Sequence, residues 1–163
     1  MEKVIVIGCP GSGKSTFSQK LQEKTGLPLY HLDMLFWNPD RTTVSREIFM
    51  RRLLPVLDEP RWIIDGNYQS TMELRLQKCD TVIFLDYSTE LCIQGIRERQ
   101  GKPRKDLPWV EPEESEEFLA FIRKFSQDNR PEIMDLLQKF SHKNIMFFHN
   151  RDEASLFLSQ ILW

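Results

Sequence analysis

The residues with the clearest chemistry lie near the start of the chain, where residues 8–15 read Gly-Cys-Pro-Gly-Ser-Gly-Lys-Ser. This segment satisfies the pattern G-x-x-x-x-G-K-[ST] at every fixed position, and a loop of that type cradles phosphate oxygens with its backbone N–H groups. Lys14 then reaches the β- and γ-phosphates, while the Ser15 hydroxyl ligates Mg²⁺. We therefore expect a nucleoside triphosphate to bind Gly8, Pro10, Gly11, Ser12, Gly13, Lys14, Ser15 and Thr16.

The elements that position this loop follow from an alternation of short apolar runs with helical patterns. Apolar runs predict strands at residues 3–7, 27–32, 62–65, 81–85 and 144–148. Helices are expected at about 14–24, 45–57, 70–78, 88–99, 116–125, 131–140 and 152–161. Such an alternation is typical of a three-layer α/β fold, in which helices cover both faces of a five-stranded parallel sheet.

Local signals refine three of these elements. Pro55 is expected to bend or end the helix at 45–57. Ser70 and Glu73 form a capping-box pattern that predicts a helix start at Ser70. A loop bearing Phe36 and Trp37 is expected to follow the second strand directly.

Three carboxylates end or follow predicted strands, where ligands bind in parallel sheets. Asp65 precedes a glycine and is expected to hold Mg²⁺ together with Ser15. Asp33 is expected to act as the base or to orient the acceptor hydroxyl. Asp86 suits either role but also suits a structural role beside a helix start.

Arginines around a proline-rich segment predict a lid. Phosphoryl transfer depends on positioning and on charge stabilisation, which arginines over the phosphates supply. The lid is expected at about residues 97–130 within a single domain spanning 1–163. Each arginine on its own also suits a solvated surface position. The candidates are Arg97, Arg99, Arg104, Arg123 and Arg130.

Composition narrows the function classes. Lys and Arg number 22 against 24 Asp and Glu, so the charge is balanced at −2 and no direct binding of nucleic acid is expected. No apolar run approaches the ~18 residues of a membrane span, so no membrane contact is expected. Three cysteines without paired spacing fit a reducing, cytoplasmic location. The histidines, His31, His142 and His149, lack metal-ligand spacing and are expected to be structural.

Four stretches of the chain resemble the bacterial topology modulation proteins, relatives of adenylate kinase among the P-loop kinases. These stretches are residues 8–16, Tyr-His-Leu-Asp at 30–33 with Phe36-Trp37, Trp-Ile-Ile-Asp-Gly-Asn-Tyr at 62–68, and residues 82–86. The resemblance implies a P-loop nucleoside triphosphate hydrolase fold with strand order 2-3-1-4-5 and a lid between the fourth and fifth strands. It also implies that Asp65 serves the metal, that Arg99 faces the phosphates and that Arg151 lies beside the adenine ring.

The sequence departs from adenylate kinases at the acceptor end. Those enzymes follow Asp-Gly with Phe-Pro-Arg, whereas this chain has Asn67-Tyr68-Gln69, and Arg75 is the candidate substitute for the missing arginine. Gly95 stands where adenylate kinases place an adenine-stacking arginine. The acceptor pocket is expected to comprise Asp33, Phe36, Trp37, Tyr68 and Arg75, although the aromatic residues among them also suit a core.

These observations favour a Mg²⁺- and ATP-dependent kinase of a small molecule, either nucleoside- or nucleotide-like or another alcohol. In this hypothesis Lys14 and Ser15 hold the triphosphate and the metal, Asp33 orients the acceptor, and Arg99, Arg123 and Arg130 stabilise transferred charge. The alternatives are a regulatory nucleotide-binding module that affects DNA topology indirectly and a simple ATPase. The sequence does not indicate an oligomeric state.

Overall fold

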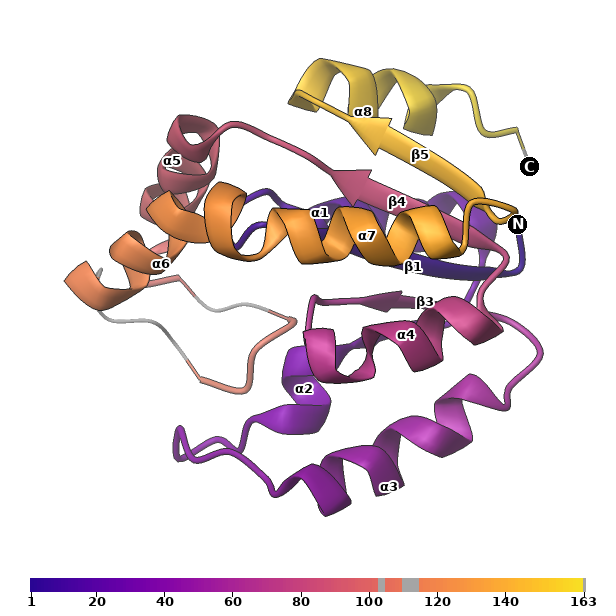
Figure 1. Ribbon diagram of the computed structural model, residues 1–163, viewed down its shortest axis with the longest axis horizontal. Coiled ribbons are helices and arrows are strands. Elements are labelled where there is room, and N and C mark those ends of the chain that lie inside the picture. Colours follow the sequence, from indigo (N-terminus) through magenta and orange to yellow (C-terminus); the bar gives the residue numbers. More distant parts are fainter. Residues whose placement is uncertain (103–104, 110–114, 163) are drawn as a thin grey trace.

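The computed structural model describes residues 1–102, 105–109 and 115–162, and a five-stranded parallel sheet forms its centre (Figure 1). The strands lie in the order β2-β3-β1-β4-β5, and each neighbouring pair is parallel. This confirms the predicted fold class and strand order. The strands are β1 (Lys3–Gly8), β2 (Leu29–His31), β3 (Trp62–Asp65), β4 (Thr81–Leu85) and β5 (Asn144–Phe148).

The three inner strands are continuous apolar runs because helices cover both of their faces. Val4–Ile7 of β1 and Trp62–Ile64 of β3 have no exposed surface. The pairing register places Asp65 opposite both Val6 and His31, so the carboxyl ends of β2 and β3 lie level with each other, and β1 continues past them to Gly8. Residues that follow these strands therefore meet at one edge of the sheet.

Eight helices are described. In Figure 1, α4 and α7 lie in front of the sheet and α1 lies behind it, where α1 also packs against α8. The helices are α1 (Lys14–Thr25), α2 (Leu32–Phe36), α3 (Arg46–Leu57), α4 (Gln69–Lys78), α5 (Thr89–Arg99), α6 (Glu116–Asp128), α7 (Arg130–Lys139) and α8 (Arg151–Ser159).

Serine caps fix the starts of several helices. Ser88 accepts a hydrogen bond from the Leu91 N–H and so begins α5 as predicted, and Ser45 caps α3 in the same way. The helix α3 ends at Leu57, as predicted, and Pro55 lies in its last turn.

Two local predictions were wrong. The second strand is shorter than expected, and a one-turn helix, α2, replaces the start of the predicted loop, so Asp33 lies in the first turn of α2. The capping box at Ser70 does not form, because α4 begins one residue earlier at Gln69. Its N-cap is Tyr68, which adopts a left-handed conformation with φ 37° and makes no side-chain cap.

Within the described part of the chain, no helix is both long enough and apolar enough to span a membrane.

Candidate active site

The phosphate loop joins β1 to α1 and leaves the helix N-terminus open. Gly13 is the N-cap of α1, with φ 90°, and it offers no side-chain acceptor to the first N–H groups of the helix. An anion can therefore accept those hydrogen bonds. Lys14 Nζ donates to the Gly8 carbonyl at 2.9 Å, and burial lowers the pKa of this ammonium. A phosphate oxygen would offer Lys14 a better partner than this carbonyl.

Two glycines let α5 lie directly against this loop. A Cβ on Gly95 would lie 2.0 Å from the Gly11 carbonyl oxygen, and a Cβ on Gly11 would lie 2.0 Å from the Cys92 carbonyl oxygen. Neither position has room for a side chain. At Gly95 the helix therefore supports the phosphate loop itself.

Asn67, which follows β3, ties the acceptor side of the site to the phosphate loop. Its side-chain oxygen accepts from the Gly8 N–H at 3.0 Å, and its amide nitrogen donates to the Gly8 carbonyl at 2.6 Å. Both polar groups of Gly8 are thus engaged by one side chain. Gly8 itself does not line the cavity described below; it shapes the loop by these contacts.

Asp65 lies at the end of β3, and its carboxylate is held in place by His31 at the end of β2. His31 Nδ1 lies 2.7 Å from Asp65 Oδ2, and both side chains are largely buried. Burial alone would lower the pKa of His31, but the hydrogen bond and the charge of Asp65 outweigh it and raise that pKa. His31 therefore orients Asp65, a role that its sequence spacing did not indicate.

The oxygen donors of Ser15 and Asp65 fit Mg²⁺, which prefers oxygen ligands and in phosphate sites takes only one or two of them from protein. Both residues line the same cavity. Among the described residues there is no cluster of three or more His, Cys, Asp or Glu side chains able to hold a metal alone. A site of this kind depends on the phosphates to complete the coordination of the ion.

Asp33 is the second carboxylate at this edge of the sheet, and the Tyr68 hydroxyl donates to its Oδ1. Burial raises the pKa of Asp33, while the Tyr68 hydrogen bond and the charge of Lys14 act in the opposite direction. The pKa of Tyr68 is raised by burial and by the nearby Asp33, so the phenol stays protonated and donates. Tyr68 thus holds one oxygen of Asp33, a residue that also lines the cavity described below.

Arg75 explains how Tyr68 keeps its unfavourable backbone conformation. The guanidinium has no exposed surface and donates to the carbonyls of Gly66, Asn67 and Tyr68, as well as to the Thr71 hydroxyl. Arg75 does not line the cavity, so the structure does not place it in the acceptor pocket as expected. The three carbonyls of this loop surround the guanidinium and accept its hydrogen bonds.

Aromatic side chains form one wall of the site. Trp37 lies 5.7 Å from Trp109, between ring centroids, in an edge-to-face arrangement. Tyr68 packs against Phe36 at 5.0 Å and Phe49 at 5.2 Å. Trp37, Tyr68 and Trp109 line the cavity, whereas Phe36 lies behind them as support and not in the pocket lining.

One cavity of about 1180 Å³ brings most of the predicted site residues together. Its lining includes residues of the phosphate loop, Asp33, Asp65 and the aromatic wall. Its wall also includes Asp106 and Trp109, which follow α5 and which the sequence did not single out. The predicted residues that line it are Pro10, Gly11, Ser12, Gly13, Lys14, Ser15, Thr16, Asp33, Trp37, Asp65, Tyr68, Arg99 and Arg151.

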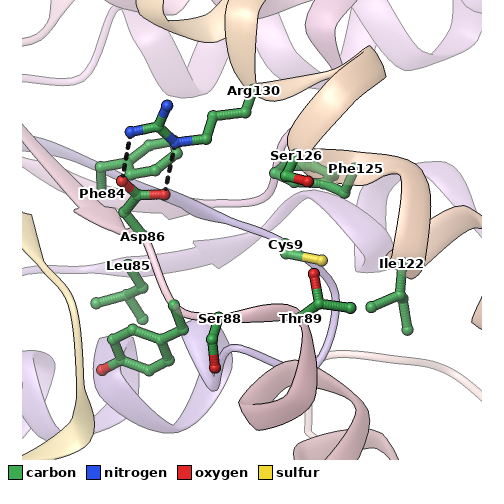
Figure 2. A pocket seen from close by; sticks show the side chains of 11 residues that line it. Cys9, Phe84, Leu85, Asp86, Ser88, Thr89, Ile122, Phe125, Ser126 and Arg130 are labelled. Carbon is green, nitrogen blue, oxygen red and sulfur yellow. Dashed lines mark hydrogen bonds and ion pairs between the residues drawn. The ribbon is translucent and has the colours of Figure 1, made fainter.

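The other predicted lid arginines that the structure describes do not line this cavity. Arg130 makes a two-pronged ion pair with Asp86, at 2.9 and 2.8 Å, beside a smaller cavity of about 270 Å³ (Figure 2). Asp86 therefore has a structural partner, and Arg130 lines this smaller cavity and not the main one. Arg123 lines a separate surface hollow with residues of α5. Arg104 lies outside the described residues. Arg151 lines the main cavity, where it pairs with Glu98 at 3.2 Å.

Comparison with solved structures identifies the same fold in known enzymes. A shikimate kinase from Acinetobacter baumannii, solved in complex with shikimate, superposes with a TM-score of 0.63 over 99% of this chain and 93% of its own, at 18% identity. A shikimate kinase from Bacteroides thetaiotaomicron gives a TM-score of 0.57 over 96% and 94%, at 16% identity. The chain shares the fold of shikimate kinases. Its sequence matches no family model and no curated protein.

Proposed function

We propose that this protein is a Mg²⁺- and ATP-dependent kinase that transfers the γ-phosphoryl group to a hydroxyl of a small molecule. One observation carries the proposal: Lys14 and Ser15 line the same cavity as Asp33, and Asp65 lines it as well. A triphosphate site and a buried carboxylate in one cavity are the parts that phosphoryl transfer to an alcohol requires. The kinase fold and the resemblance to topology modulation proteins support the same activity.

In this proposal each group has one task. The backbone N–H groups at the start of α1 and the Lys14 ammonium bind the β- and γ-phosphates, and Arg99 faces them from α5. Ser15 and Asp65, with Asp65 oriented by His31, would hold Mg²⁺. When bound, this ion offsets the negative charge on the phosphate oxygens.

Asp33 accepts the proton of the acceptor hydroxyl through the oxygen that Tyr68 does not engage. The acceptor oxygen forms a bond to the γ-phosphorus while the bond from that phosphorus to the β,γ-bridging oxygen breaks. The products are ADP and a phosphate monoester, and the proton rests on Asp33. Tyr68 keeps the carboxylate oriented throughout.

The proposal is tested with γ-labelled ATP and a panel of nucleosides, nucleotides, sugars and small alcohols, shikimate among them. We expect transfer to depend on the acceptor and to fall by about 10²–10⁴-fold in Asp33→Asn, with ATP affinity within about twofold of wild type. Asp58→Asn is the matched control, because Asp58 is exposed and lies outside the cavity. Absence of any acceptor, or transfer by Asp33→Asn at the wild-type rate, would refute the assignment.

A further inference from the structure

Arg41 lies in a tight loop that joins α2 to α3. Its N–H donates to the Asn38 carbonyl at 3.0 Å, and the Asn38 N–H donates to the Thr42 carbonyl at 2.7 Å. Trp37 and Thr43 pair across the base of this loop in an antiparallel bridge. Arg41 has φ 69°, a left-handed conformation that glycine or asparagine adopts more readily. An arginine at this position costs stability, which points to a role for its side chain.

The side chain of Arg41 faces the main cavity. Its guanidinium lies over the Trp109 ring, 5.1 Å from the centroid, and both residues line the cavity, so the loop that follows α2 approaches residues 105–109 (Figure 1). Among the residues that the structure describes, none accepts a hydrogen bond from this guanidinium or forms an ion pair with it. A guanidinium carries N–H donors in a planar fork that matches a carboxylate or a phosphate. Trp109 thus positions a cation whose donors remain open to a ligand.

A series of ring contacts connects this guanidinium to the carboxylate that is proposed to take the proton of the acceptor. Tyr68, whose hydroxyl donates to Asp33, packs against Phe36 at 5.0 Å. Phe36 contacts Trp37 at 5.9 Å, and Trp37 contacts Trp109 at 5.7 Å between ring centroids. The carboxylate and the guanidinium therefore stand at the two ends of one series of aromatic contacts.

The charges of the cavity lining differ between these two ends. Three carboxylates lie close enough to His31 for their charges to raise the pKa of its imidazole: Asp65, Asp106 and Asp33. Three cations of the lining come from the loop after α2 and from the segment after α5: Arg41, Lys102 and Lys105. An anion beside the carboxylates would be repelled, whereas a hydroxyl group would not be. The cavity therefore suits a molecule that has a hydroxyl at one end and an anion at the other.

Resting on the proposed kinase function, we propose that the acceptor carries an anionic oxygen group, a carboxylate or a phosphate ester, besides the hydroxyl that is phosphorylated, and that Arg41 binds this group. The hydroxyl is directed to Asp33 and the anion to the guanidinium, with the body of the acceptor along the aromatic wall. Lys102 and Lys105 add positive charge that favours the entry of an anion. Arg41 is thus a specificity-determining residue, because a neutral alcohol does not form its charge-assisted hydrogen bonds.

The test is calorimetric titration in the presence of a non-hydrolysable ATP analogue and Mg²⁺, with pairs of probes that differ in the anion. Shikimate and its methyl ester form the carboxylate pair, and uridine 5′-monophosphate and uridine form the phosphate pair. We expect the anionic member of at least one pair to bind about tenfold more tightly than its neutral partner, as hydrogen bonds to a charged group provide. The pair that shows this preference identifies the anion. Equal affinity within both pairs, or no binding by any of the four probes, would overturn the inference.

Variants at Arg41 assign the preference to this side chain. Arg41→Gln is expected to lower the affinity for the anionic probe about tenfold and to leave that of its neutral partner within about twofold. Arg46→Gln is the matched control, because Arg46 is exposed, lies outside the cavity and carries the same charge. Arg41→Lys keeps the charge without the fork and is expected to give an intermediate affinity. A preference for the anion that survives in Arg41→Gln would contradict the assignment.

Arg41→Gly separates a role in binding from a role in folding. Glycine adopts a φ of 69° without strain, and this relief offsets the lost contact with Trp109. The melting temperature is therefore expected to stay close to that of wild type, while the preference for the anionic probe is lost. A marked fall in melting temperature with an unchanged preference would show that Arg41 serves the fold, and it would overturn the inference.

Failure of this inference is distinguishable from failure of the kinase proposal. Phosphoryl transfer to a neutral alcohol that Arg41→Gln does not affect overturns the inference and leaves the kinase intact. Binding of an anionic probe that depends on Arg41, without transfer to any compound, supports the anion site and refutes the kinase.

Discussion

Replacing Gly95 by alanine tests whether α5 determines the shape of the phosphate loop. The new methyl group would lie 2.0 Å from the Gly11 carbonyl oxygen, and ordinary contact begins near 3.4 Å, so loop and helix must separate by about 1.4 Å. Alanine is intrinsically the better helix former by about 1 kcal/mol, which favours the variant. Overpacking costs about 1–3 kcal/mol and acts against a backbone atom that has no rotamer to change. We expect the clash to outweigh the gain.

The functional effect of Gly95→Ala is expected to exceed its effect on stability. A displacement of about 1 Å at a site of this kind costs on the order of 10²-fold in activity, and we propose that the N–H groups of Gly11 and its neighbours bind the phosphates. Calorimetric titration with an ATP analogue measures the loss of affinity, and urea unfolding measures stability. Gln94→Ala, at the exposed preceding position of the same helix, is the control and is expected to leave both unchanged. A Gly95→Ala protein that is more stable and binds ATP normally would refute the reasoning.

The remaining predictions concern single side chains of the site. Lys14→Ala is expected to abolish most of the thermal shift induced by Mg-ATP while leaving the melting temperature without ligand nearly unchanged, as differential scanning fluorimetry would show. Burial raises the pKa of Asp33. As the pH is lowered, we therefore expect transfer activity to begin to fall above pH 3.9, which is about the ordinary pKa of an aspartate side chain, and a pH–rate profile measures this. The same raised pKa means that the ionised Asp33 carboxylate destabilises the fold at neutral pH, and that this cost diminishes as the pH falls below the raised pKa. Asp33→Asn is therefore expected to be at least as stable as wild type at pH 7. Arg75→Met is expected to cost about 2–4 kcal/mol in urea unfolding, because the three loop carbonyls lose their donor.

A specific experimental result would contradict each of these predictions. An unchanged Mg-ATP shift in Lys14→Ala would place the triphosphate elsewhere, and an acid limb near pH 3.9 would remove Asp33 from the proton transfer. Arg52→Met is the control for Arg75→Met, because Arg52 is exposed and makes one hydrogen bond, to the Leu35 carbonyl. Similar stability losses in the two arginine variants would show that the loop does not depend on Arg75.

The sequence predicted the sheet and the phosphate loop well because both depend on local signals. Short apolar runs such as Trp62–Ile64 are fully buried, and the glycine pattern dictates the loop that follows β1. Helix α2 was missed because five residues without a side-chain cap give no periodic pattern. Asp33 still reaches the site, since the first turn of α2 lies at the same edge of the sheet as the strand end would have.

The roles of the long charged side chains could not be predicted in this way. Arg130 pairs with Asp86, which lies 44 positions earlier in the sequence, and no local sequence pattern indicates that pairing. Arg75 is committed to carbonyls of a loop whose shape depends on the left-handed Tyr68. The contact of His31 with Asp65 follows from strand register, which sequence spacing alone did not reveal.

A crystal structure with a non-hydrolysable ATP analogue and Mn²⁺ would test the central claim most directly. The account predicts triphosphate density along residues 10–16, an anomalous Mn²⁺ peak between the phosphates and the side chains of Ser15 and Asp65, and the Asp33 carboxylate facing the γ-phosphate across open space. A nucleotide bound elsewhere, or a γ-phosphate walled off from Asp33 by packed side chains, would contradict it.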